Sequence, residues 1–206
     1  MPGWPGKTVR QCGDNESIKA TKLGPVMESL NQTITLGGGC FWCTEAVYVN
    51  VRGVLDVESA YCNGHVPKVT YEQVCSGTTG HNEVVKLVFD PAQISLREIL
   101  EIFFIIHDPT SLNRQGADTG TQYRSGIYFS SPEHEQAAKA FMREVTESKT
   151  FERPIVTELL PLANYVTAED YHQDFFANNP NQGYCVSVAG PKVAKFRKTF
   201  TRLAKN

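Results

Sequence analysis

The sequence predicts an α+β domain in which an antiparallel or mixed sheet carries helices packed on it. Short segments that are rich in β-branched residues, or that alternate between apolar and polar residues, indicate strands. Longer segments with apolar residues at helical spacing indicate helices. The segments run strand, helix, strand, strand, helix, strand, which is the order of a split βαβ, ferredoxin-like sandwich; extended termini flank it.

The first half of the fold rests on four segments. Residues 33–38, TITLGG, favour a short strand, and residues 40–51, CFWCTEAVYVNV, favour the helix that it feeds. Residues 54–61, VLDVESAY, and 83–89, EVVKLVF, alternate as half-buried strands do. The turn residues NGHVPK lie between these two strands.

The second half begins with a capped helix. Ser95 precedes Glu98 by three residues, which predicts a capping box at the start of a helix over 95–107. A Gly- and Asp-rich loop follows at 108–122. The remaining predicted elements are a strand at 125–130, a helix at 132–148 with Pro132 in its first turn, and a further strand at 155–162.

Length and composition favour one main domain with short extensions. The 206 residues, 41% hydrophobic and 10% aromatic, suffice for a packed core. We expect a flexible or loosely docked extension at 1–32, a domain that carries the activity at 33–190, and a basic helix or tail at 191–206.

Charge and hydropathy give no general argument for a nucleic-acid or membrane partner. The net charge is −2, and no apolar run approaches the ~18–20 residues that span a bilayer. The N-terminal stretch lacks the apolar segment of a secretory signal. We therefore expect a cytoplasmic monomer that binds neither nucleic acid nor a membrane.

The tail at 191–206, PKVAKFRKTFTRLAKN, has six cationic residues and no acidic one. Its apolar residues Val193, Phe196, Phe200 and Leu203 recur at helical spacing, which predicts a docked helix with a basic outer face. An electrostatic contact with nucleic acid or an acidic partner is the alternative.

A reactive thiol is predicted at Cys40, within GGGCFWCTE at 37–45. The three glycines allow a sharp turn and a close approach to a ligand. If the helix starts at Cys40, the thiol lies at the positive end of the helix dipole, which favours the nucleophilic thiolate. Phe41 and Trp42 could wall an apolar pocket. The alternative is a buried structural cysteine beside two core aromatics.

Cys43 opens two other possibilities, a general disulfide oxidoreductase or a thiol-based redox or metal-binding module. Six cysteines in a chain of this length without a secretory signal favour reactive or metal-binding thiols over a disulfide framework. The bulky Phe-Trp pair inside Cys-x-x-Cys is unlike a thioredoxin-type dithiol. A zinc site would need further ligands, and the candidates lack a second close pair: Cys62, His65, Cys75 and His81.

Four separated blocks together resemble the A-type methionine sulfoxide reductases. They are GGGCFW, TYEQVCSGTTGHNEVVKL at 70–87, HDPTSLNRQGADTGTQYRSGIYF at 107–129 and NPNQGYC at 179–185. The resemblance covers about residues 33–185, and the predicted split βαβ order agrees with the fold of that family. It implies reduction of the S-epimer of methionine sulfoxide, free or in proteins, as a repair of oxidative damage.

The resemblance also implies roles for individual residues. Cys40 matches the nucleophile and Glu83 the proton donor, which needs an apolar surround that raises its pKa. The remaining matches are Tyr71 and Tyr123 as hydroxyl donors to the sulfoxide oxygen, Asp118 as the substrate- and water-binding acid, Phe41 and Trp42 around the S-methyl group, and His172 and Tyr184 at the mouth of the site. Taken alone, His172 fits a surface helix equally well.

The implied cycle leaves Cys40 as a sulfenic acid, which a second thiol converts to a disulfide for thioredoxin to reduce. No cofactor or metal is required. Cys185, in GYC, matches the family's C-terminal resolving thiol on a Gly- and Asn-rich segment able to swing in. Cys43, where the family commonly has Gly, is the alternative resolver, disfavoured because a disulfide within an intact helix would constrain its first turn. Cys62 is the other departure, in YCNG, where YAGG is common.

Overall fold

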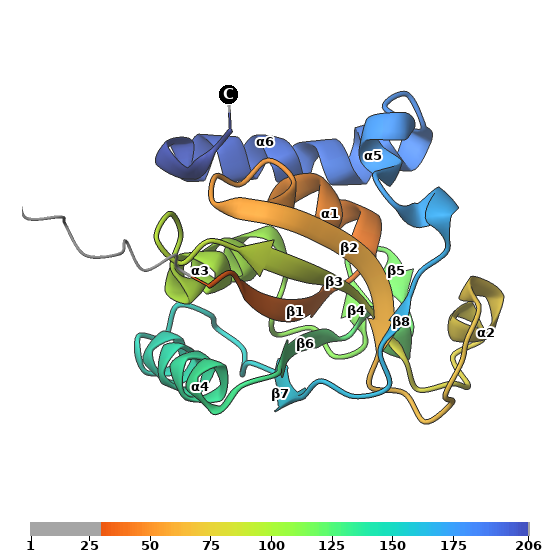
Figure 1. The fold of residues 1–206 in the computed structure, drawn as a ribbon, viewed down its shortest axis with the longest axis horizontal. Coiled ribbons are helices and arrows are strands. Elements are labelled where there is room, and N and C mark those ends of the chain that lie inside the picture. The colour runs from red at the N-terminus through yellow and green to blue at the C-terminus, as the bar shows by residue number, and fades with distance from the viewer. Residues whose placement is uncertain (1–29, 206) are drawn as a thin grey trace, which may run out of the picture.

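A six-stranded mixed sheet forms the centre of the structure, a computed structural model in which residues 30–205 are described (Figure 1). Its strand order is β7-β6-β1-β3-β2-β8, and every neighbouring pair is antiparallel except β6 and β7. The strands are β1 (Gln32–Gly38), β2 (Val54–Cys62), β3 (Asn82–Phe89), β6 (Ser125–Phe129), β7 (Glu158–Pro161) and β8 (Val166–Thr167).

The predicted strands are confirmed to within a few residues at each end. β3 lies between β1 and β2, so the strand–helix–strand unit that begins the fold is split by an inserted strand, as its chain order predicts. The strand predicted over 155–162 is shorter, Glu158–Pro161. The edge strand β8 and a small hairpin, β4 (Arg114–Gln115) with β5 (Asp118–Thr119), are additions to the prediction.

Helices cover one face of this sheet. They are α1 (Phe41–Tyr48), α3 (Leu96–Ile106), α4 (Pro132–Glu147) and α6 (Gly190–Thr199), and their apolar residues join Leu36, Val85 and Leu87 of the sheet in one core. The opposite face holds a small cluster of Ala60, Cys62, Val84 and Tyr128, covered by Leu162 and Tyr165. The short helical segments are α2 (Tyr71–Cys75), a 3-10 turn at Thr121–Tyr123, another at Asp170–His172, α5 (Phe175–Asn178), a π-helical turn at Cys185–Ala189 and a last 3-10 turn at Thr201–Leu203.

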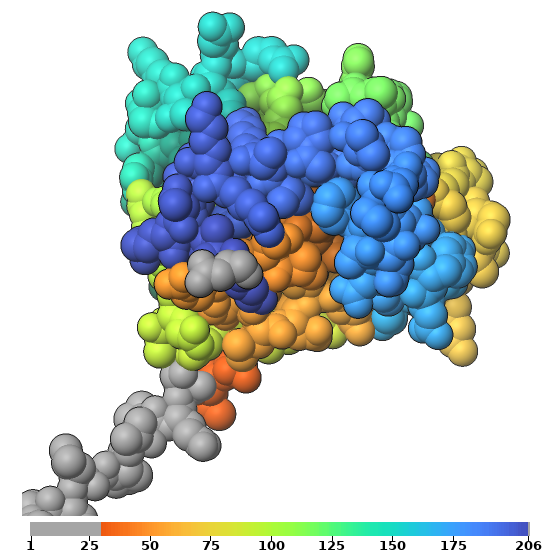
Figure 2. All heavy atoms as spheres, turned by 90° about the horizontal axis from the view of Figure 1, so that it is seen from above, coloured from red at the N-terminus to blue at the C-terminus, as the bar shows by residue number. Residues whose placement is uncertain are grey.

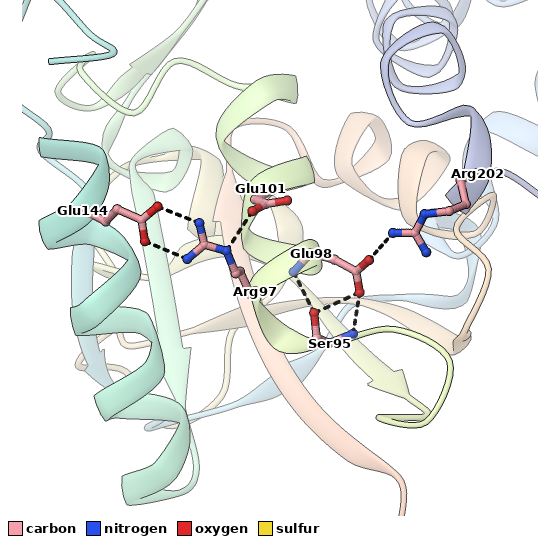
Figure 3. A network of polar contacts seen from close by, with 6 residues as sticks. All are labelled: Ser95, Arg97, Glu98, Glu101, Glu144 and Arg202. Atoms are coloured by element: carbon pink, nitrogen blue, oxygen red, sulfur yellow. Dashed lines mark hydrogen bonds and ion pairs between the residues drawn. The ribbon is translucent and has the colours of Figure 1, made fainter. Parts of the chain in front are cut away.

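The capping box predicted for α3 is present and belongs to a wider polar network (Figure 3). Ser95 and Glu98 exchange side-chain and backbone hydrogen bonds, and Arg202 at the chain's end binds Glu98. Arg97 reaches Glu101 on α3 and forms two hydrogen bonds, each 2.7 Å long, with Glu144 on α4. These exposed pairs fix how α4 and the C-terminal segment meet α3 more than they stabilise the fold.

The glycine run between β1 and α1 has the conformation that its sequence predicts. Gly39 has φ +90°, in the region that favours glycine, and a Cβ there would lie 2.6 Å from Gln115. A Cβ on Gly37 would lie 2.2 Å from the side chain of Asn82. The run therefore lets β1 approach β3 closely and turn at once into α1.

The C-terminal segment docks on α1 and α3, as one of its two predicted alternatives requires. Val193, Phe196 and Leu203 are buried, and Figure 2 shows the C-terminal part of the chain that is drawn in blue lying over the orange segment that holds α1 and β2. Four of its six cationic residues bind groups within the chain. Lys195 donates to the carbonyl of Ile105, and Lys205 donates to the carbonyls of Val49 and Val54. Arg197 binds the side chain of Asn50, and Arg202 binds that of Glu98.

The N-terminal extension predicted at 1–32, including Cys12, lies outside the described residues except for 30–32. None of the helices in residues 30–205 combines the length and the apolar content needed to cross a membrane.

Phe196→Ala should lower the free energy of unfolding by about 3–5 kcal/mol, because it removes a fully buried aromatic side chain between α6 and the core. Urea denaturation measures the loss, and Lys198→Ala, an exposed change on the same helix, should stay within about 0.5 kcal/mol. A loss below about 1 kcal/mol for Phe196→Ala would contradict the docking of α6.

Candidate active site

Cys40 lies where the sequence predicts a reactive thiol, between the end of β1 and the first turn of α1. It is the N-cap residue of α1 and is 7% exposed. Its side chain, however, accepts no hydrogen bond from the backbone N–H groups of that turn. The thiol is therefore beside the helix terminus without being bonded to it.

Glu83 takes the position at the helix terminus instead. Its side chain, 1% exposed on β3, accepts a hydrogen bond of 3.2 Å from the backbone N–H of Phe41, the first residue of α1. Burial raises the pKa of Glu83 to about 8, helped by the negative charges of Asp118 and Cys43 and opposed by the Phe41 N–H. At neutral pH this carboxyl group is mostly protonated, which is the state a proton donor needs.

The two thiols of Cys-x-x-Cys are hydrogen-bonded to each other, and each shifts the pKa of the other. Burial, the bond with Cys43 and the charge of Glu83 raise the pKa of Cys40. The bond from Cys40 lowers the pKa of Cys43 to about 7 against the effect of burial, and the charge of Lys192 helps. The sequence prediction of a lowered pKa at Cys40 is therefore wrong for this substrate-free arrangement, because burial and Glu83 outweigh the helix dipole.

Tyr184 contacts Cys43 rather than standing apart at the mouth, and Asp118 joins them through the Tyr184 hydroxyl. The Cys43 thiol donates to the Tyr184 hydroxyl at 3.6 Å, and that hydroxyl donates to Asp118 at 2.6 Å. Asp118 and Tyr184 also line a cavity of about 350 Å³ that Lys192 borders from α6. A polar chain thus runs from the second thiol towards solvent-accessible space.

Tyr71 and Tyr123 bring their hydroxyl groups near Glu83 from two different segments. Tyr71 begins α2, and its hydroxyl is hydrogen-bonded to the Cys75 thiol. Tyr123 ends the 3-10 turn before β6. Burial raises the pKa of both hydroxyls and the charge of Glu83 adds to it, so both remain protonated donors at neutral pH.

The indole ring of Trp42 is fixed by a stacking contact on one face and by a hydrogen bond from its N–H. Its ring stacks on Phe175 of α5, with centroids 3.7 Å apart and planes at 8°. Its indole N–H donates to Nδ1 of His172 at 3.1 Å. His172 is 1% exposed and also packs against Phe41 at 5.0 Å and Tyr71 at 4.5 Å between centroids, so it is not a surface histidine.

The sequence prediction assigned no functional role in this site to three residues: Phe175, Glu45 and Glu169. Phe175 forms the far side of Trp42. Glu45, buried on α1, accepts the N–H groups of Asp174 and Phe175 at 2.9 and 3.0 Å. Glu169 accepts the N–H of Tyr71 at 2.9 Å. The repeated aromatic and acidic residues of AEDYHQDFF, at 168–176, were the available signal.

Cys185 is not on a segment that leaves it exposed. It is fully buried at the start of the π-helical turn, near enough to Cys43 for a charge there to raise its pKa, after the effect of burial. The five cysteines between residues 30 and 205 are all free thiols. Within the same residues no three His, Cys, Asp or Glu side chains are grouped so that they could hold a metal ion.

The sequence and the fold of this chain are similar to those of known proteins. The family model described as peptide methionine sulfoxide reductase matches residues 32–204. The peptide methionine sulfoxide reductase MsrA of Deinococcus radiodurans is 54% identical over 163 residues, 79% of each chain. That of Saccharolobus solfataricus is 55% identical over 169 residues, 82% of this chain and 94% of the relative.

Two solved structures extend the similarity to three dimensions. The crystal structure of reduced Mxr1 from Saccharomyces cerevisiae has a TM-score of 0.69 and 36% identity, covering 75% of this chain and 89% of its own. Methionine sulfoxide reductase A of Corynebacterium diphtheriae has a TM-score of 0.67 and 35% identity, covering 74% of this chain and 76% of its own. Because the family model spans most of the chain and relatives exceed half identity, this chain belongs to the peptide methionine sulfoxide reductase family of enzymes.

Proposed function

We propose that this enzyme reduces the S-epimer of methionine sulfoxide, free or in proteins, with Cys40 as nucleophile and Glu83 as proton donor. The observation that carries the proposal is the buried carboxyl group of Glu83, protonated near neutral pH and bonded to the N–H of the residue that follows Cys40. A sulfoxide oxygen leaves only when it is protonated, so a neutral acid beside a thiol suits this reduction.

The chemical step follows from these positions. The Cys40 thiolate attacks the sulfoxide sulfur, whose partial positive charge offsets the burial of the thiolate. Glu83 delivers a proton to the oxygen, while Tyr71 and Tyr123 donate hydrogen bonds to it. The S–O bond of the substrate breaks and its oxygen passes to the Cys40 sulfur as a sulfenic acid, while the substrate sulfur keeps the bonding electron pair and leaves as methionine. The substrate sulfur gains the two electrons that Cys40 loses.

The aromatic wall supplies the binding energy in this proposal. Phe41 and Trp42 enclose the S-methyl group, and His172 with Phe175 fixes the plane of Trp42. At the border of this aromatic wall, Asp118 orients polar atoms of the substrate or of a water molecule. Tyr184 is hydrogen-bonded to Asp118 there. These roles add to the contact of Tyr184 with Cys43 and to the hydrogen bond between Tyr184 and Asp118.

We propose that Cys43 reacts first with the sulfenic acid and that Cys185 then attacks the Cys40–Cys43 disulfide. The hydrogen bond between Cys40 and Cys43 supports the first step, and the burial of Cys185 beside Cys43 supports the second. This order differs from the sequence preference for Cys185. Because Cys40 is the N-cap, only Cys43 lies inside the helix, which removes much of the strain expected for that disulfide.

A thioredoxin-type dithiol is the proposed reductant, and no cofactor or metal enters the cycle. We propose that the enzyme works as a monomer in the cytoplasm. Residues 33–190 would carry the activity, with 191–206 covering α1. The four strands β6-β1-β3-β2 with α1 and α3 support the ferredoxin-like description of this unit.

A reductant-dependent assay with separated sulfoxide epimers tests the proposed function. We expect turnover of the S-epimer and at least about 100-fold less of the R-epimer, since a site that holds methyl and oxygen at fixed places rejects the mirror arrangement. Equal turnover of both epimers, or of neither, would overturn the proposal.

Glu83→Gln should slow single-turnover reduction about 10²–10⁴-fold, because the amide can still accept the Phe41 N–H but cannot donate an acidic proton. With a pKa of about 8, Glu83 is protonated below that pH and loses its proton above it, so the wild-type rate should fall as pH rises through about 8. Glu72→Gln, an exposed acid on α2, is the control. A Glu83→Gln variant as fast as wild type, or with the same alkaline decline, would remove Glu83 from this role.

Single-turnover mass analysis distinguishes the two resolving thiols. Cys40→Ser should be inactive. Cys185→Ser should still reduce one equivalent of sulfoxide and form a Cys40–Cys43 disulfide, whereas Cys43→Ser should leave a trappable sulfenic acid on Cys40. Cys62→Ala, on the opposite face of the sheet, should leave both steps unchanged. Disulfide formation at the normal rate in Cys43→Ser would restore Cys185 as the first resolver.

A further inference from the structure

The donors around His172 fix which ring nitrogen carries its proton. An indole N–H can only donate, so Nδ1 of His172, which receives the Trp42 N–H, must be the unprotonated acceptor. Burial lowers the pKa of His172, so the ring is neutral and its single proton is on Nε2. The Trp42 contact therefore exists for one of the two neutral tautomers only.

The proton on Nε2 faces the carboxylate of Glu169, and Glu72 adds a second, weaker negative charge. Nε2 is buried without a hydrogen-bond partner in the described structure, and Oε2 of Glu169 lies 3.8 Å from it. This distance is too long for a direct hydrogen bond, yet the negative charge favours a proton on that side of the ring. The other sides of the ring are covered by the aromatic rings of Phe41, Trp42, Tyr71 and Tyr171.

Glu169 serves two further donors of the same site. Its Oε1 accepts the backbone N–H of Tyr71 at 2.9 Å, and its Oε2 accepts the hydroxyl of Tyr61, also at 2.9 Å. Burial raises its pKa, but the hydrogen bonds that it accepts lower the pKa overall, which keeps the carboxylate ionised. Three donors thus converge on one carboxylate, and only a group with two acceptor oxygens can face all three.

We propose that Glu169 is a positioning residue that holds His172 in its Nε2–H tautomer and thereby fixes the Trp42 wall of the substrate pocket. The link runs from Glu169 through His172 to the indole N–H of Trp42, while the same carboxylate anchors Tyr71 through its backbone. The effect on substrate rests on the proposed function, whereas the tautomer is a property of the free protein.

Glu169→Gln tests the link because it keeps the size of the side chain and removes one acceptor. If the amide oxygen stays on the Tyr71 N–H, the amide NH₂ faces Nε2, which must then become an acceptor. The proton would move to Nδ1 and oppose the Trp42 N–H. In the other orientation the amide NH₂ would oppose the Tyr71 N–H, which lies 2.9 Å from the carboxylate in the wild type, so the first orientation is favoured.

The direct readout is nitrogen NMR of His172 in the full, substrate-free chain. Wild type should show a protonated Nε2 and an unprotonated Nδ1, with a hydrogen-bonded Trp42 indole N–H. Glu169→Gln should lose this pattern, and Glu169→Asp, which keeps two acceptor oxygens, should retain it at least in part. An unchanged His172 and Trp42 pattern in Glu169→Gln would overturn the proposal.

Trp42→Phe gives a second reading that does not depend on how Glu169→Gln folds. Phenylalanine keeps an aromatic wall but has no N–H to impose on Nδ1, so only Glu169 is left to set the tautomer. His172 should keep its proton on Nε2. A shift of the proton to Nδ1 in Trp42→Phe would show that Glu169 does not control the ring.

Steady-state kinetics with the S-epimer of a free sulfoxide then connect the link to binding. Glu169→Gln should raise KM by up to about tenfold, the equivalent of losing the hydrogen bond between Trp42 and His172, with kcat within about threefold. Added to Trp42→Phe, it should raise KM no further. An unchanged KM in Glu169→Gln, or a full tenfold rise on top of Trp42→Phe, would contradict the route through Trp42.

Glu58→Gln is the matched control. Glu58 is also a carboxylate that accepts a tyrosine hydroxyl, that of Tyr165, but it lies on β2 away from His172 and binds Lys86. It should change neither KM nor the His172 pattern. A wild-type protein without sulfoxide reductase activity would refute the proposed function, while the NMR patterns would still decide the link.

Discussion

The hydrogen bond between the first N–H of α1 and Glu83 is the contact on which the site depends. A helix N-terminus carries about half a positive charge, enough to favour one buried anion beside it. Glu83 and Cys40 both lie there, and both are nearly excluded from water. Because two anions at one buried helix end would repel each other, at least one of the two groups keeps its proton. The raised pKa values of Glu83 and Cys40 both reflect the cost of burying negative charge at this helix end.

Sheet register produces that arrangement. β1 and β3 pair antiparallel with Leu36 opposite Val85, so the C-terminal end of β1 lies beside the N-terminal end of β3. After one glycine turn, α1 begins at this same end of the sheet. On the other side of β3, Tyr61 lies opposite Glu83, and its hydroxyl continues to Glu169. One pairing pattern therefore places the acid beside the thiol and connects it, through β2, to the residues that hold the aromatic wall.

Local sequence patterns predicted β1, β3, α3 and α4 to within about two residues, because period and caps are properties of adjacent residues. The same signals placed Cys40 at the start of the helix, one position inside its observed N-cap place. They did not give the effect of that position, since nothing near Cys40 in sequence reveals that Glu83, 42 residues after Phe41, fills the helix end. The parts played by Glu45, Glu169 and Phe175 were equally hidden. The contacts that define these parts join residues 98 to 133 positions apart, and in isolation an acidic, aromatic segment resembles an exposed helix face.

The burial of Cys185 places a physical demand on the second half of the cycle. A disulfide between Cys40 and Cys43 would lie inside the aromatic enclosure, where an outside dithiol has poor access, whereas Cys185 lies one residue from Val186, which is 61% exposed. Cys185 begins a π-helical turn, and residues 181–183 and 186–187 on either side of it are exposed, so few buried contacts hold this segment. Local opening there costs less than opening α1 or the sheet. Transfer of the disulfide to Cys185 would therefore move the oxidised sulfur from the rigid centre of the site to its most easily opened border, and leave the geometry of Cys40, Glu83 and Trp42 in place for the next substrate.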